Sequence, residues 1–308
     1  MINRILIRIR VIQIVYAWYQ NRNKDVSQVE KELLLGLQKS YDLYFYLLLL
    51  MVEITDLYEK RVDTKMNKFL PTHDDLNPKM HLIKNQFIQQ LRDNRMFVKF
   101  LSERPFSWES NSNFVRSTLD KILDSDAYKI YTELEKPTYS DDKEFWRKTF
   151  KSFIYRNEEL DDILEDESIF WNDDIEIVQS FVHKSIKQFN KSEGENQKLL
   201  PMFNDDEDRE YAIKLLRETI MNEKSYREQI THHVENWDFE RIAFMDVIIM
   251  QIAMAELHSF PSIPINVTLN EYIDIAKSYS TPKSSTFING ILDAIVTELK
   301  KDKTFFKN

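Results

Sequence analysis

The chain of 308 residues, 43% of them hydrophobic, is long enough to bury the core of one large domain or two modest ones. It has no cysteine, which excludes disulfides and thiolate metal sites and fits a cytoplasmic protein, and its longest apolar run, residues 44–52, is too short to span a membrane. Hairpin sheets, dinucleotide folds and phosphate loops all need glycine, so the presence of only three glycines predicts an all-α protein with long helices and few tight turns.

The first element carries a basic charge. In residues 4–10 charged and bulky side chains alternate as in an edge strand, but from Val11 to Trp18 the apolar residues recur at helical spacing. We therefore predict a helix over residues 3–20. Residues 1–24 have a net charge of +5, residues 241–308 a net charge of 0, and the acidic middle a net charge of −14. This asymmetry indicates either an anionic partner for the N-terminus or simply a basic first helix on an acidic protein.

The middle of the chain is predicted to be a series of helices. Asp25 can cap a helix over residues 26–39, and the apolar run belongs to a buried helix over residues 41–60. Residues 191–197 have the composition of a linker. Many acidic residues occur between residue 60 and this linker, and we interpret them as a solvated face. Further helical patterns cover residues 82–101, 113–134, 145–164 and 175–189.

The C-terminal third has the clearest helical pattern. Acidic residues 205–208 mark the start of a helix that runs to about residue 233, because carboxylates are favoured at the positive end of the helix dipole. Asp238 can cap the next helix, which ends near His258 and is apolar nearly all round, so it should be central and buried. Within it, Asp246 needs a hydrogen-bonding partner, since an unpaired buried carboxylate is costly.

Two more helices follow. Residues 268–271 match a capping box, which predicts a helix from there to about Tyr279. Thr281 and Pro282 are typical of the N-cap and first residue of the last helix. Gly290 lies inside that helix, where glycine costs roughly 1 kcal/mol relative to alanine, so we expect a close helix contact there.

The start of the last helix is a candidate anion site. A lysine in the first turn of a helix is disfavoured by the dipole, whereas the free N–H groups beside it suit an anion. An aromatic residue follows, which could stack on a base. The residues at this position are Lys283, Ser284, Ser285, Thr286 and Phe287.

No motif for catalysis is found. The six histidines lack metal-ligand spacing, and His232 and His233 would point to different sides of a helix, at the surface or half-buried. There is no nucleophile elbow, Walker loop or dinucleotide-binding fingerprint. The sequence therefore predicts a binding protein with no catalytic residue, metal site or cofactor.

Three C-terminal stretches resemble the NusB family of transcription antitermination factors. They are residues 246–257, the segment IPINVTLNEYIDIAK (263–277) and the segment FINGILD (287–293). The arginine-bearing first helix, with Val15-Tyr16-Ala17-Trp18, is similar to the first helix of that family. The resemblance covers about residues 1–40 and 206–300, and it implies an all-α fold built from a pair of small helical bundles.

Family members are about half the length of this chain. We therefore assign residues 1–40 to the basic first helix and the second helix of the NusB-like fold, residues 41–205 to an acidic helical insertion, and residues 206–308 to the C-terminal helical region. Residues 41–60 and 208–230 both resemble the third helix of the family, and we favour 208–230 because it runs straight into the diagnostic segments. Because the insertion is acidic, we do not expect it to bind RNA.

The resemblance also implies a function without catalysis. NusB-type proteins pair with NusE, a ribosomal protein of the small subunit, and bind boxA RNA in nascent ribosomal transcripts. The complex joins RNA polymerase and suppresses premature termination. The first-helix arginines would line a phosphate-binding flank. The residues carried over by position to the RNA-binding surface are Arg4, Arg8, Arg10, Lys283, Ser284, Thr286 and Phe287.

Two other hypotheses remain open. A similar helical domain precedes an RNA cytosine methyltransferase in the RsmB branch, but the chain ends at Asn308, so we expect no such enzyme here. Alternatively, the protein is a helical scaffold whose acidic insertion docks a basic protein, and RNA binding is incidental.

Overall fold

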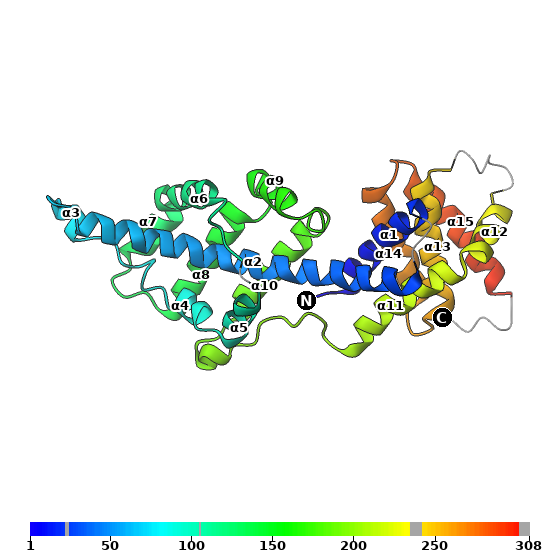
Figure 1. Ribbon diagram of the computed structural model, residues 1–308, viewed down its shortest axis with the longest axis horizontal. Coiled ribbons are helices and arrows are strands. Elements are labelled where there is room, and N and C mark those ends of the chain that lie inside the picture. Colours follow the sequence, from blue (N-terminus) through cyan, green and yellow to red (C-terminus); the bar gives the residue numbers. More distant parts are fainter. Residues whose placement is uncertain (22–24, 105, 235–241, 302–308) are drawn as a thin grey trace. The chain divides into compact units, whose positions relative to one another are not determined.

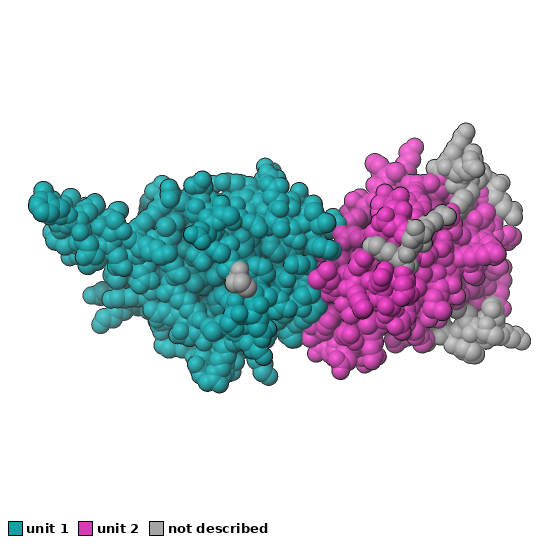
Figure 2. All heavy atoms as spheres, viewed as in Figure 1, with its two compact units in different colours: residues 1, 38–202 teal, residues 2–37, 203–308 magenta. Residues whose placement is uncertain are grey.

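The computed structural model describes residues 1–21, 25–104, 106–234 and 242–301 (Figure 1). Their regular structure is helical and includes no strand, which confirms the all-α class. No helix in these ranges is long and apolar enough to cross a membrane. The chain forms two compact units, unit 1 with Met1 and Gln38–Met202, and unit 2 with Ile2–Leu37 and Phe203–Asn308 (Figure 2). The assignment of residues 41–205 as an insertion into a family fold stays a proposal.

Unit 2 is organised around one buried helix. All residues from Asp246 to Leu257 are buried, and this helix packs against five others, as its apolar sequence predicts. The expected N-cap, Asp238, lies outside the described residues. The helices of unit 2 are α1 (Arg4–Gln20), the first part of α2 (Val26–Met66), α11 (Asp206–Met221), α12 (Glu223–His232), α13 (Phe244–Ser259), α14 (Ile265–Tyr279) and α15 (Ser284–Leu299).

The opening stretch is a helix and not a strand. Helix α1 begins after Asn3, whose side chain accepts a hydrogen bond from the N–H of Leu6 at 2.9 Å. It packs against α11 and α13, and most of its residues are buried, including positions on every side. Its alternating pattern therefore reflects burial all round and not the two faces of a strand.

Unit 1 is built around the second part of α2. Every residue from Ser40 to Val52 is buried, which confirms the predicted buried helix. The separation into helices over 26–39 and 41–60 is wrong, because α2 continues through 41 residues. Residues 38–41 contain neither proline nor glycine, so nothing interrupts the propagation of the helix there.

Shorter helices surround α2 in unit 1. Two tryptophans attach their segments to its backbone, since the indole N–H of Trp108 donates to the carbonyl of Tyr46 and that of Trp171 to the carbonyl of Lys39. The shorter elements are α3 (His73–Leu76), α4 (Gln86–Arg92), α5 (Arg95–Glu103), α6 (Ser112–Asp124), α7 (Asp126–Glu133), α8 (Tyr139–Thr149), a π-helical turn η1 (Phe150–Ile154), α9 (Glu158–Glu167), α10 (Ile175–Gln188) and a 3-10 turn η2 (Lys191–Asn196).

Polar caps divide helices that were predicted to be continuous. The pattern over 82–101 forms α4 and α5, that over 113–134 forms α6 and α7, and that over 145–164 forms α8, η1 and α9. In each case a side-chain oxygen accepts the N–H three residues later, so the new helix begins without glycine or proline. The capping residues are Asn85, Asn94, Ser125 and Asn157.

The supposed linker is part of the packed structure. Residues 191–196 form η2, and the side chain of Gln90 donates to the carbonyls of Asn190 and Gly194, each at 2.9 Å. Gly194 has a φ of +50°, in the region that favours glycine.

Three expectations for the C-terminal helices are corrected. The pattern over 207–233 forms two helices, because the chain turns at Asn222 between α11 and α12. Helix α14 begins at Ile265, directly after Pro264, so Thr268 is not an N-cap; its buried hydroxyl donates to Glu256 at 2.8 Å. Helix α15 begins at Ser284, with Lys283 at the N-cap position, so Thr281 and Pro282 precede the helix.

Two glycines lie inside helices, and they differ in the space available for a side chain. A Cβ on Gly36 of α2 would lie 2.7 Å from Cδ and 3.0 Å from Nε of Arg10 in α1. A Cβ on Gly290 of α15 would have no described atom outside its own helix segment within 4 Å. The predicted close helix contact is therefore absent at Gly290 among the described residues, whereas the Arg10 side chain lies close against Gly36.

We expect Gly290→Ala to stabilise the protein by about 1 kcal/mol, since alanine favours the helix and meets no obstacle. We expect Gly36→Ala to destabilise it by about 1 kcal/mol, because overlap with the buried Arg10 side chain outweighs the same propensity gain. Far-UV circular dichroism during thermal unfolding of the two variants measures the difference. Equal stabilisation by both would contradict the close contact of the Arg10 side chain with Gly36.

Candidate nucleic-acid interface

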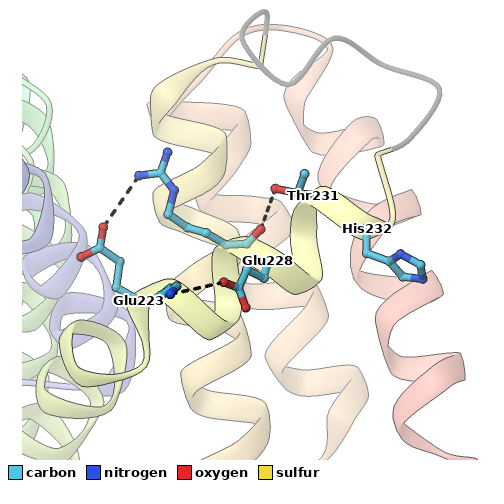
Figure 3. Close-up of a pocket in the computed structure, with 6 residues that line it drawn as sticks. Glu223, Glu228, Thr231 and His232 are labelled. Carbon is cyan, nitrogen blue, oxygen red and sulfur yellow. Dashed lines mark hydrogen bonds and ion pairs between the residues drawn. The ribbon is translucent and has the colours of Figure 1, made fainter.

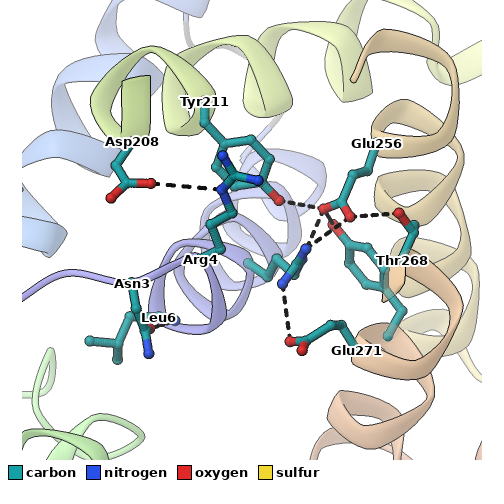
Figure 4. Close-up of polar contacts among 10 residues, drawn as sticks. Asn3, Arg4, Leu6, Asp208, Tyr211, Glu256, Thr268 and Glu271 are labelled. Carbon is teal, nitrogen blue, oxygen red and sulfur yellow. Dashed lines mark hydrogen bonds and ion pairs between the residues drawn. The ribbon is translucent and has the colours of Figure 1, made fainter. Parts of the chain in front are cut away.

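The three arginines of α1 lie in different environments. Arg4 has 40% of its side chain exposed, and its guanidinium lies 5.1 Å from the centre of the Tyr211 ring and 3.7 Å from the carboxylate of Asp208 (Figure 4). Arg8 and Arg10 are only 2% and 3% exposed. They therefore do not form the exposed phosphate-binding flank that the sequence suggests, because the helix that carries them is buried on nearly all sides.

Arg8 forms a buried ion pair with Glu256 of α13. Its Nε and Nη2 donate to the two carboxylate oxygens at 2.8 and 2.9 Å, and its Nη1 donates to Oε2 of Glu271 in α14 at 3.0 Å. The Glu256 side chain is fully buried and the Arg8 side chain is 3% exposed. This bidentate ion pair fixes both the position and the orientation of the guanidinium. It therefore holds α1 in register with α13.

Hydroxyl groups complete the surroundings of Glu256. Tyr211 of α11 donates to Oε2, Tyr272 of α14 donates to the same oxygen at 3.1 Å, and Thr268 of α14 donates to Oε1 at 2.8 Å (Figure 4). We call the six residues Arg8, Tyr211, Glu256, Thr268, Glu271 and Tyr272 the Arg8 cluster. It joins four helices of unit 2 through one carboxylate.

The pKa values of the pair show that its charges are compensated. Burial alone would raise the pKa of Glu256, but the bonds and charge of Arg8, with the donated hydroxyls of Tyr211 and Thr268, lower it below the ordinary value. Burial alone would lower the pKa of Arg8, but the bond to Glu256 and neighbouring negative groups raise it. Both groups therefore stay ionised inside the protein.

A second polar cluster holds the start of α15. The hydroxyl of Ser284, which is 1% exposed, donates to Oδ2 of Asp246 at 2.8 Å, and the hydroxyl of Ser280 donates to Oδ1. The backbone N–H of Thr281 donates to Oγ of Ser284 at 3.1 Å. Asp246 thus has the hydrogen-bonding partners that the sequence requires. The Ser284 side chain is buried and binds Asp246 instead of facing the solvent.

Side chains next to Ser284 remain on the surface. Lys283 and Thr286 are exposed, and Phe287 is half-buried. Among the seven predicted site residues, the structure brings Arg4 and Arg8 to the same Tyr211 ring and attaches Ser284 to α13. The residues with exposed or partly exposed side chains are Arg4, Lys283, Thr286 and Phe287.

Sequence reasoning missed Glu256 and its hydroxyl donors. The available signal was an acidic residue within the most apolar helix, together with an arginine in another apolar helix. Each buried charge demands an opposite one, so Arg8 and Glu256 could have been paired. The hydroxyl donors gave no such signal, because tyrosine and threonine occur throughout the chain.

A shallow pocket of about 690 Å³ lies on α12 (Figure 3). Its charged groups pair along the helix, with Arg227 3.7 Å from Glu223 and Lys224 4.0 Å from Glu228. His233 nearby lies 2.9 Å from Glu298. In the ranges that the structure describes, no group of three or more histidine, aspartate or glutamate side chains is arranged to hold a metal ion.

Comparison with known proteins finds a family model that matches part of the chain. Residues 174–297 match the model of the NusB family, a range that begins at α10 in unit 1. Three of the matching relatives are described as transcription antitermination protein NusB. The one from Salinibacter ruber is 41% identical over 100 residues, the one from Chloroherpeton thalassium 39% over 100 residues, and the one from Natranaerobius thermophilus 36% over 92 residues.

These alignments are partial. They cover 32%, 32% and 30% of this chain, and 62%, 47% and 66% of the respective relatives. The chain therefore spans about half to two thirds of the length of these relatives. No solved structure matches.

We expect Glu256→Gln to destabilise the protein by about 3 kcal/mol, because it leaves the Arg8 charge buried without its main counter-charge. Urea unfolding followed by circular dichroism measures the change. Glu298→Gln, at an exposed glutamate of the same unit, is the control and should change stability by less than about 1 kcal/mol. A similar small effect at Glu256 would show that the cluster is not important for stability.

The contribution of Glu256 should depend on pH. Its folded-state pKa is lower than its ordinary value of 4.5, so its stabilising effect is complete above that value and is lost as the pH falls through the folded-state pKa. The stability difference between the natural protein and Glu256→Gln should therefore be constant near neutral pH and shrink below about pH 4.5. Urea unfolding of both proteins from pH 6 to pH 3.5 tests this, and a difference that grows on acidification contradicts it.

Proposed function

We propose, from the NusB family domain that this chain contains at residues 174–297, that the protein is an RNA-binding transcription antitermination factor. The observation that carries the proposal is the 36–41% identity to proteins described as transcription antitermination protein NusB. The function is binding without catalysis, and it takes place where transcripts are made, in the cytoplasm.

The exposed members of the predicted site make the RNA contacts in this proposal. Arg4 offers a partly exposed guanidinium, and Lys283 and Thr286 offer exposed polar groups at the N-terminal end of α15, where helix N–H groups favour an anion. Phe287 is half-buried and leaves part of its ring for a base. Arg8, Arg10 and Ser284 hold the helices that carry these groups.

We further propose the partners of the NusB-type mechanism. The RNA is a single-stranded boxA-type element of a nascent ribosomal transcript, and NusE, a small-subunit ribosomal protein, binds together with it. The complex joins RNA polymerase and suppresses premature termination. The net charge of −9 supports a requirement for a second protein, since an acidic protein attracts RNA weakly on its own and a basic partner compensates.

The first experiment measures fluorescence anisotropy of labelled boxA RNA with the protein, with and without NusE, beside a scrambled RNA of equal length. We expect tighter binding to boxA RNA, strengthened by NusE. Equal binding to both RNAs in both conditions would refute boxA recognition, and no binding to either would refute the RNA-binding function.

Salt dependence tests the proposed residues. With about three to five phosphate contacts, the slope of log K against log salt should be roughly −2 to −3.5. The double variant Arg4→Gln/Lys283→Gln should reduce the size of this slope by about 1.4, because it removes two contacts. The matched control Lys31→Gln/Lys224→Gln removes two exposed charges of the same unit elsewhere and should leave the slope unchanged. Identical slopes for both variants would exclude Arg4 and Lys283 as contacts.

A further inference from the structure

Unit 1 carries a concentration of basic residues on two helices that pack together, α8 with its continuation η1, and α10 (Figure 1). On the α8 side Lys143, Arg147 and Lys151 follow one another at intervals of four and Lys148 lies three before Lys151, and on the α10 side the two lysines lie three apart, so residues at these spacings are neighbours on the helix surface. They are Lys143, Arg147, Lys148, Lys151, Lys184 and Lys187. We call this set the α8–α10 basic surface.

Contacts across the two helices show that the residues form one surface. Nζ of Lys143 donates to the carbonyls of Lys187 at 3.3 Å and Phe189 at 3.0 Å, and Nη1 of Arg147 lies 3.4 Å from Nε2 of His183. The α8 end near Lys143 therefore faces the C-terminal end of α10, and the following turn faces His183. The two basic rows run side by side.

The pKa of His183 is affected by the same basic residues. Burial lowers the pKa of this histidine, and the positive charges of Lys187, Arg147 and Lys151 lower it further. These charges are therefore close enough to disfavour another positive group. At neutral pH His183 stays uncharged and adds nothing to the surface potential.

The acidic residues of α8 and α10 neutralise only part of this surface. Glu144 pairs with Arg147 and Lys148, while the two other acids of α8 serve elsewhere: Asp141 caps its own helix and Asp142 is buried against Tyr131. The acid of α10, Glu176, binds Arg156 near the other end of that helix.

The lysines are placed to reach a ligand. Lys148, Lys151, Lys184 and Lys187 are exposed. Within the described ranges no ion pair is found for the last three of them. These four exposed ammonium groups, of which that of Lys148 is paired with Glu144, form a local positive patch on an otherwise acidic protein.

We propose that the α8–α10 basic surface binds the phosphate backbone of RNA, as a second contact region in addition to the one proposed on unit 2. This inference rests on the proposed function, which supplies RNA as the anion, and it replaces the expectation that acidic residues 41–205 do not bind RNA. Lysines contact phosphate as point charges, so the surface binds without a preference for sequence.

The chemistry favours a nucleic-acid backbone over a lipid surface. Binding to a membrane by a helical surface needs exposed apolar side chains beside the basic ones. No large exposed hydrophobic residue is found on α8, η1 or α10 in the described structure. A row of charges without such groups suits a polyanion that remains in water.

The test compares two quadruple variants of the full chain. Lys148→Gln/Lys151→Gln/Lys184→Gln/Lys187→Gln removes the exposed charges of the surface, and Lys60→Gln/Lys65→Gln/Lys79→Gln/Lys136→Gln removes four exposed charges elsewhere in unit 1. Far-UV circular dichroism checks that both remain folded. The ligand is a labelled 30-nucleotide poly(U), measured by anisotropy at several salt concentrations, beside vesicles of anionic and neutral phospholipid.

We expect the first variant to bind poly(U) at least ten-fold more weakly and with a salt slope smaller by roughly 2 to 3. The control should remain within two-fold of the natural protein. Crosslinks from 4-thiouridine RNA should map to peptides within residues 139–154 and 175–191. Equal binding by both variants, or crosslinks confined to unit 2, would overturn the inference.

The outcomes separate this inference from the proposed function. If the natural protein and the first variant bind boxA RNA and poly(U) equally, the second contact region fails while the antitermination proposal stands. If the natural protein binds no RNA, both fail. If the first variant loses binding to anionic vesicles but not to RNA, the surface recognises lipid, and the inference is overturned.

Discussion

The buried ion pair between Arg8 and Glu256 is the interaction on which unit 2 depends. The two residues are 248 positions apart in the sequence, and most of unit 1 lies between them in the chain. Burying two charges is costly unless each finds both a counter-charge and further hydrogen bonds. Glu271, Thr268 and two tyrosine hydroxyls meet this requirement. One carboxylate thereby sets the register of α1, α11, α13 and α14, which an apolar core alone would leave less well specified.

Because Arg8 is buried in this ion pair, the basic N-terminal helix is not simply an anion-binding surface. An arginine-bearing helix on an acidic protein suggests an anion-binding surface, yet Arg8 binds carboxylates of its own chain and Arg10 lies against Gly36. Arg4 and the residues around Lys283 keep surface groups. Ser284 shows the same division, since its hydroxyl binds Asp246 while its neighbour Thr286 is exposed. Residues of the same sequence motif therefore fall into two groups. Some are buried and stabilise the packing of the helices, and others are exposed and can bind a ligand.

Net charge describes the surface of this protein poorly. The central part of the chain is strongly acidic, but many of its carboxylates cap helices or pair with nearby arginines, as Asp141 and Glu176 do. The lysines of α8, η1 and α10 gather on packed helices, and the pKa of His183 is lowered first by burial and then by the positive charges of Lys187, Arg147 and Lys151. Attraction of a polyanion depends on such local fields, because charges farther apart than about 8 Å are largely screened at physiological salt.

The sequence by itself determined the helical class, the two buried helices and the family resemblance, because scarce glycine, long apolar runs and a distinctive C-terminal pattern are local properties. It misplaced helix boundaries in unit 1, since Asn85, Asn94, Ser125 and Asn157 each cap the start of a helix without glycine or proline. It also took Arg8, Arg10 and Ser284 for surface groups. Only the tertiary structure decided those roles, because a polar side chain is buried or exposed according to which distant residue meets it, and Glu256, Gly36 and Asp246 are distant in the sequence.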